Sequence, residues 1–209
     1  MGARLYRLIR NLHLFFGLFL SPFALVFAVS VFFLVHRWLP GFAPSVSTTR
    51  VVSDLPLPEN VKTLSGRALI DALRPALDKA EVHGEVGFVR QVVKEDRFII
   101  PVMVPGRTTT VSLSVAKREA SIEWRETGVS DALVLLHKSP GQHLVNIRMN
   151  WFYMRLWRWC ADATVYLLMF ITVSGIYLWS MLRAERRVGL TLLVAGALSF
   201  FGMAYALSH

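Results

Sequence analysis

The 209-residue chain has one cysteine, Cys160, and few acidic residues: 14 Asp and Glu against 23 Lys and Arg. A single cysteine cannot form an intramolecular disulfide, so no disulfide framework holds this fold. Cys160 lies among aromatic residues, and we interpret it as a small packing residue. The net charge of +9 suggests nucleic acid, but the basic residues are spread along the chain and not gathered in a stripe. We therefore expect no nucleic-acid partner.

Two kinds of enzymatic motif are also missing from the sequence. No GxGxxG follows a strand pattern, and no flavin-binding domain is recognisable, so nicotinamide or flavin chemistry would have to come from a separate protein. The segment between the apolar runs shows no nucleophile paired with a base.

Charge is absent from three long stretches, which is the dominant feature of a chain with 54% apolar residues. The uncharged runs are 12–36, 163–182 and 188–207. Between His13 and His36, the first run covers about 33 Å as a helix, enough to cross a ~30 Å hydrocarbon core. A cleaved signal peptide would have a shorter apolar region, followed by small residues and not by His36-Arg37-Trp38. The pattern predicts three transmembrane helices.

Basic residues in the short flanks predict the orientation. Three arginines precede the first run and three lie between the second and third, which places both flanks in the cytoplasm. We therefore expect 37–158 outside, in the periplasm of a Gram-negative bacterium, and the protein in the inner membrane. The six arginines are Arg4, Arg7, Arg10, Arg183, Arg186 and Arg187.

The outer segment changes its periodicity along the chain. Residues 65–80 have apolar positions at helical spacing after Ser65, a predicted N-cap. Alternating patterns then predict four strands, over 85–94, 97–105, 108–115 and 120–125. The predicted fold class is a mainly α membrane protein with three transmembrane helices and a small extracytoplasmic α+β module.

The predicted organisation divides the chain into seven segments. They are a basic N-terminus with the first helix (1–38), a linker (39–64), the α+β module (65–128), an interfacial histidine and aromatic segment (129–158), the second helix (159–182), a cytoplasmic turn (183–187) and the third helix (188–209).

Histidines near the membrane boundaries are the candidate site residues. A lone boundary histidine is usually only a polar end residue, but imidazole is also a common metal and haem ligand. The predicted topology places His36 and His137 at the same level at the outer face. His143 and His209 lie at that level too and are further candidates. His13 lies at the inner face with no histidine partner there. Asp162 has Arg158 four residues earlier as its expected partner.

Together these segments resemble the PepSY-associated transmembrane proteins, bacterial inner-membrane proteins that include haem-containing siderophore and ferric reductases. The resemblance covers about a third of the chain and depends on three stretches. They are the LH…G…SP…S…H pattern (Leu12, His13, Gly17, Ser21, Pro22, Ser30, His36), the Leu136-His137 pair, and Asp162 with the run 174–179, SGIYLW. The helix-then-sheet order of 65–125 is also similar to a PepSY module.

The resemblance implies haem b as cofactor, with His13, His36 and His137 as axial ligands and ferric iron or a ferric chelate as electron acceptor. Arg148, Arg155 and Arg158 are then candidates for pairing with haem propionates. Larger members contain two such units, so this chain is expected to form a homodimer. The donor is either a cytoplasmic flavin or NAD(P)H reductase, or a quinol. The alternative function is a non-enzymatic membrane anchor whose outer module binds a partner; metal transport or sensing is a third.

Overall fold

The computed structural model describes residues 2–36, 47–139, 147, 149–182 and 185–208. The chain divides into two units, Met1–Phe23 with Ala163–His209, and Ala24–Asp162. Within the described residues, three helices are long and apolar enough to cross a membrane: α1 (Gly2–Val35), α4 (Phe152–Met181) and α5 (Arg186–Ser208). Their large apolar side chains are mostly exposed, as expected for surfaces that face lipid.

Helix α1 continues without a break through Pro22. Proline has no N–H, so the carbonyl of Leu18, four residues earlier, loses its helical donor. The Ser21 hydroxyl donates to that carbonyl at 2.9 Å. The serine side chain thereby satisfies the carbonyl that proline leaves without a helical donor.

Helix α4 begins at Phe152, seven residues before the predicted start of the second helix. The aromatic residues from 152 to 159 therefore lie in the same helix as the predicted second span. No glycine or proline interrupts the chain between 151 and 174, so nothing in the sequence ends the helix earlier.

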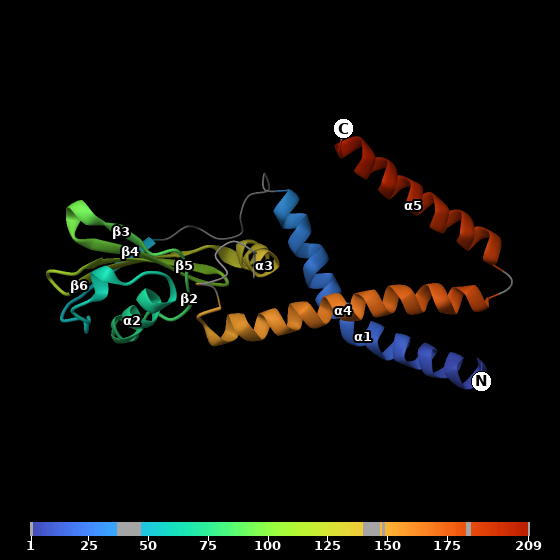
Figure 1. Ribbon diagram of the computed structural model, residues 1–209, viewed down its shortest axis with the longest axis horizontal. Coiled ribbons are helices and arrows are strands. Elements are labelled where there is room, and N and C mark those ends of the chain that lie inside the picture. The colour runs from blue at the N-terminus through green and yellow to red at the C-terminus, as the bar shows by residue number, and fades with distance from the viewer. Residues whose placement is uncertain (1, 37–46, 140–146, 148, 183–184, 209) are drawn as a thin grey trace. The chain divides into compact units, whose positions relative to one another are not determined.

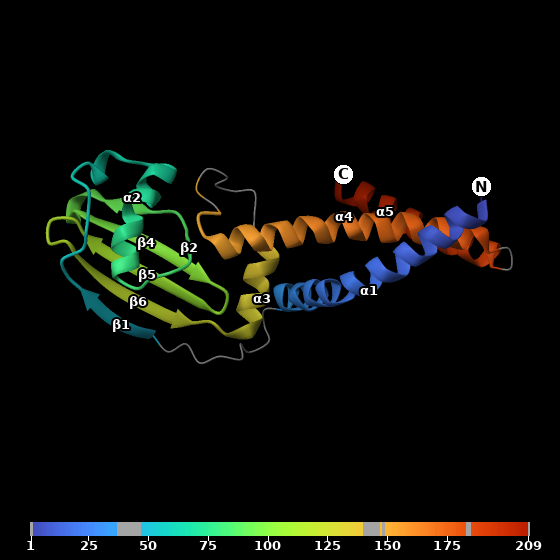
Figure 2. The ribbon, with the colours of Figure 1, turned by 90° about the horizontal axis from the view of Figure 1, so that it is seen from below.

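The α+β module is a six-stranded antiparallel sheet with one helix on one face (Figures 1 and 2). Its path is β1-β6-β5-β4-β2, with β3 also paired to β4. The strands are β1 (Ser47–Val52), β2 (Glu85–Val86), β3 (Arg90–Val92), β4 (Arg97–Val104), β5 (Arg107–Ser114) and β6 (Glu119–Glu126). Two 3-10 turns, η1 (Val61–Thr63) and η2 (Val93–Glu95), lie between them.

The module core lies between the sheet and α2 (Gly66–Lys79). Leu69, Ile70, Leu73 and Leu77 of α2 are all buried, which confirms the predicted apolar helix face. Alternate residues of β4, β5 and β6 are buried against this face, among them Phe98, Ile100, Val111, Leu113 and Ile122. Each such side chain contributes roughly 1.5–3 kcal/mol by leaving water.

Two predictions for the module are wrong in part. The expected linker 39–64 contains β1, which pairs along β6 from Ser47 opposite Arg125 to Val52 opposite Ala120. The expected strand 85–94 is divided into β2 and β3. Their registers on β4 differ by one residue, and the Gly87 N–H between them donates to the Pro101 carbonyl. Pro101 cannot donate back, so the ladder is interrupted by a bulge at this point.

Candidate functional site

His137 is anchored to helix α1 by a buried serine. It lies in the last turn of α3 (Gly128–Lys138). Its Nδ1 is 3.0 Å from Oγ of Ser30, which is 1% exposed. The Phe27 ring contacts the imidazole edge-on at 5.7 Å.

The Ser30 contacts determine which imidazole nitrogen carries the proton. The Ser30 hydroxyl is 2.6 Å from the Phe27 carbonyl oxygen. A carbonyl can only accept, and two oxygens this close repel unless a proton lies between them, so the hydroxyl donates to the carbonyl. Its single proton is thereby used, and the Nδ1–H of His137 donates to Ser30 Oγ. Nε2 of His137 then carries the lone pair.

His13 has the same arrangement in the other unit. Its Nδ1 is 2.8 Å from Oγ of Ser174, which is 4% exposed, and the Ser174 hydroxyl lies 3.2 Å from the Ile171 carbonyl. A Cβ on Gly175 would lie 3.5 Å from Cε1 of His13, so the imidazole lies directly against this glycine. When the Ser174 hydroxyl donates to the Ile171 carbonyl, Nδ1–H of His13 donates to Ser174 Oγ and Nε2 carries the lone pair.

His36 uses its own helix for the same purpose. Its Nδ1 is 3.0 Å from the Phe32 carbonyl, and its ring stacks on the Phe32 ring at 4.5 Å. Since the carbonyl only accepts, Nδ1 of His36 is also protonated. In all three histidines implied as ligands, Nδ1 thus has a hydrogen-bond partner. An imidazole that donates Nδ1–H to such a partner carries on Nε2 the lone pair that a metal requires.

These contacts do not bring His36 and His137 next to each other, as the prediction expected. His137 lies against Ser30, and Ser30 precedes His36 by six residues, about 9 Å along the helix axis and about 120° around it. Among the described residues, no three His, Cys, Asp or Glu side chains form a metal-binding cluster. The pairing stays a prediction.

A tryptophan of α4 fixes the end of the helix that carries His137. The indole Nε1 of Trp157 donates to the Leu136 carbonyl at 2.9 Å, and its ring lies 5.8 Å from Phe27. The last carbonyls of a helix lack an intrahelical donor, so Trp157 satisfies a group that would otherwise be unpaired. Trp157, in the predicted histidine and aromatic segment, thus has a specific contact beside His137.

Of the candidate arginines, Arg155 is exposed on α4. Arg158 is also exposed: Nη1 donates to the Met149 sulfur at 3.0 Å and Nε lies 3.6 Å from Asp162. This confirms the expected pairing of Arg158 with Asp162. His143, Arg148 and His209 lie outside the described residues.

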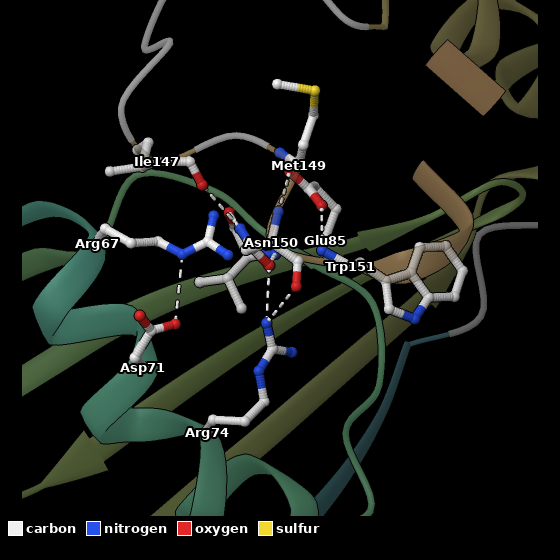
Figure 3. A network of polar contacts seen from close by, with 9 residues as sticks. Arg67, Asp71, Arg74, Glu85, Ile147, Met149, Asn150 and Trp151 are labelled. Atoms are coloured by element: carbon white, nitrogen blue, oxygen red, sulfur yellow. Dashed lines mark hydrogen bonds and ion pairs between the residues drawn. The ribbon is translucent and has the colours of Figure 1, made fainter. Parts of the chain in front are cut away.

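A second polar network, which the sequence did not indicate, connects the sheet to the start of α4 (Figure 3). The Glu85 carboxylate on β2 is 6% exposed and accepts the backbone N–H groups of Met149, Asn150 and Trp151. Three successive N–H groups directed at one carboxylate form an anion-binding nest, and a helix N-terminus favours negative charge. Burial raises the pKa of Glu85 above its ordinary value, while these three donors act in the opposite direction.

Asn150 completes this network by pairing with the edge strand. Its side-chain amide accepts the Val86 N–H at 3.0 Å and donates to the Val86 carbonyl at 2.7 Å, so it occupies the place of a strand partner. Arg74 of α2 donates to both oxygens of Asn150, the backbone one at 2.9 Å and the side-chain one at 3.0 Å. No local sequence signal could have found contacts between residues 64 positions apart.

Comparison of the chain with protein-family models, curated proteins and solved structures finds no match. The function therefore has to be argued from the residues and their geometry.

Proposed function

We propose that this chain is a b-type haem membrane oxidoreductase that passes electrons to ferric iron or a ferric chelate on the periplasmic side. The observation that supports this most is the common arrangement of His13, His36 and His137, in which Nδ1 of each imidazole has a hydrogen-bond partner. Ligating histidines in proteins typically donate the other ring N–H to an acceptor, which fixes the tautomer and the ring orientation.

The donor set fits haem better than a protein-only metal centre. Haem needs only axial ligands from the protein, so single anchored imidazoles suffice where clusters of three ligands are not found among the described residues. When bound, the haem would carry the electron. Ser30 and Ser174 would orient the ligands, and Arg155 and Arg158 would be available to propionates.

The proposal includes assembly and location. We propose that the protein lies in a bacterial inner membrane with its N-terminus in the cytoplasm, as a homodimer in which His13 of each copy ligates haem together with His13 of the other. Similarity to the PepSY-associated transmembrane proteins is part of this proposal. The electron donor is a cytoplasmic flavin or NAD(P)H reductase, or a quinol.

A visible spectrum of the purified protein tests the function. The full chain, purified in detergent from haem-replete cells, should show a Soret band that shifts on reduction with dithionite. His13→Ala, His36→Ala and His137→Ala should each lower the haem-to-protein ratio or change the spectrum. His83→Ala is the matched control, because His83 is an exposed side chain on the module, near Asp78. A colourless wild-type protein would refute the proposal.

One observation favours the alternative, a membrane-anchored binding module. β1 ends the path of the sheet, and no strand in the described part of the chain pairs with its outer side. Such an edge can accept an extended peptide as an added strand. Capture of a peptide by a protein that contains no haem would support this reading over the oxidoreductase.

A further inference from the structure

A cavity of about 280 Å³ lies where the bulged edge of the sheet meets the end of α3 and the first turn of α4. Its walls are mostly apolar and include three methionines, Met103 of β4, Met149 before α4 and Met154 within it, with Leu135 of α3 opposite. Met154 is 4% exposed. Polar residues among the lining are few: Lys138, Ser139 and Glu85, whose carboxylate oxygens already accept backbone N–H groups.

Helix α3 connects this cavity to the histidine site. Leu135 and Lys138 line the cavity, whereas His137 contacts Ser30 of α1. Residues 135 and 137 are about 200° apart around a helix, so the two sites lie on opposite faces of the same short helix. The cavity and the His137 imidazole are therefore separated by about one helix diameter.

The chemistry of the walls favours a flat conjugated ring with oxygen substituents. Thioethers make favourable contacts with aromatic rings and adapt to their shape. Lys138 and Ser139 supply donors for a carbonyl oxygen. A soft metal ion is disfavoured, because the Arg158 guanidinium donates to the Met149 sulfur at 3.0 Å and would repel a cation there.

The volume of the cavity limits the size of the ligand. Sites for drug-sized ligands occupy about 300–1,000 Å³, so this cavity lies just below the lower limit of that range and suits a single substituted ring. A complete ferric chelate is too large for it. Met154 lies in the first turn of α4, an apolar candidate span, so an apolar tail on the ring could continue along a lipid-facing surface.

We propose that this cavity binds the headgroup of a membrane quinone, through apolar and methionine contacts to the ring and a hydrogen bond from Lys138 to a carbonyl oxygen. That the bound molecule is the electron donor rests on the proposed function. Binding of the quinone in this cavity does not depend on the proposed function.

The test measures binding of ubiquinone-1 to the full chain in detergent by equilibrium dialysis. Leu135→Trp fills the cavity and should lower affinity at least tenfold. Lys138→Met removes the donor to the quinone carbonyl and should lower the affinity for ubiquinone-1 several-fold. Lys117→Met, a change at an exposed lysine in the β5–β6 turn, should leave this affinity unchanged. If Leu135→Trp does not fold by circular dichroism, Met103→Phe fills the cavity from the sheet side.

Three results would overturn the proposal. Wild-type affinity in both cavity-filling variants would place the quinone elsewhere. Equal competition by decanoate would show that an apolar tail, and not the ring, is recognised. Tighter binding of 2,3-dihydroxybenzoate, with the same loss in Leu135→Trp, would assign the cavity to a free catechol instead. A colourless protein that binds ubiquinone-1 in this way would refute the proposed haem function but support the quinone site. A red protein that does not bind ubiquinone-1 would support the haem function and refute the quinone site.

Discussion

The side-chain amide of Asn150 binds both backbone groups of Val86, 64 residues away, as a neighbouring strand would. Val86 is 1% exposed, so its N–H and carbonyl cannot turn to water if the amide is lost. The segment that precedes α4 thereby closes the edge of the sheet next to the cavity that Glu85, Val86 and Met149 help to line.

Asn150→Ala should therefore destabilise the module edge. A buried polar group left without its partner costs about 1–3 kcal/mol, and this substitution leaves two. Hydrogen exchange of the full chain should show faster exchange in peptides covering 85–92 and 147–155. Asn60→Ala, an exposed asparagine before η1 with no side-chain cap bond, is the control. Unchanged protection of 85–92 in Asn150→Ala would contradict this role.

The pH dependence of stability should reveal Glu85. Burial raises the pKa of the folded carboxyl above its ordinary 4.5. The folded chain then keeps this proton to higher pH than the unfolded chain, so the free energy of unfolding should fall as pH rises from about 4.5 to the folded pKa, and level off above it. Glu85→Gln should flatten this fall.

Urea unfolding across this pH range checks the Glu85 prediction. Exposed Glu123→Gln on β6 should keep the wild-type slope. A Glu85→Gln variant that is less stable by the same amount at every pH would show that the carboxylate acts only as a hydrogen-bond acceptor.

Much of the fold could be predicted because its signals are local. Apolar residues at helical spacing gave α2, alternation gave β4, β5 and β6, and uncharged runs gave the three long helices. The strand β1 was missed because five of its six residues are exposed and proline-rich segments flank it, so no alternation shows. The bulge at Pro101 was missed because it depends on the partner strand.

The candidate site was predictable in its histidines but not in their partners. Ser30 and Ser174 are polar residues within the uncharged runs and belong to the stretches that carry the resemblance, but no local pattern indicates which residues they contact. Their bonds to His137 and His13 join positions 107 and 161 residues apart. Such contacts arise from tertiary packing, and the periodicity of the sequence carries no information about them.

Replacing Ser30 or Ser174 should lower the affinity for haem at the histidine that the serine contacts. Ser30→Ala and Ser174→Ala delete the acceptor for Nδ1–H, and loss of such a partner typically lowers metal affinity about 10- to 100-fold. Titration of the haem-free protein with haem, followed at the Soret band, measures this. Ser180→Ala is matched, since its hydroxyl donates to the Tyr177 carbonyl in the same way. Equal haem affinity in all three variants would remove the positioning role.

The last prediction concerns Ser21 and Pro22 in α1. Ser21→Ala leaves the Leu18 carbonyl without the hydroxyl, and Pro22 cannot supply an N–H, so the variant should lose about 0.5–1.5 kcal/mol of stability. In a Pro22→Ala background, residue 22 regains an N–H for Leu18, so the same serine substitution should cost much less. Unfolding of the four proteins in mixed micelles gives this interaction energy as a double-mutant cycle. Equal costs in the two backgrounds would mean that the serine does not replace the donor that proline removes.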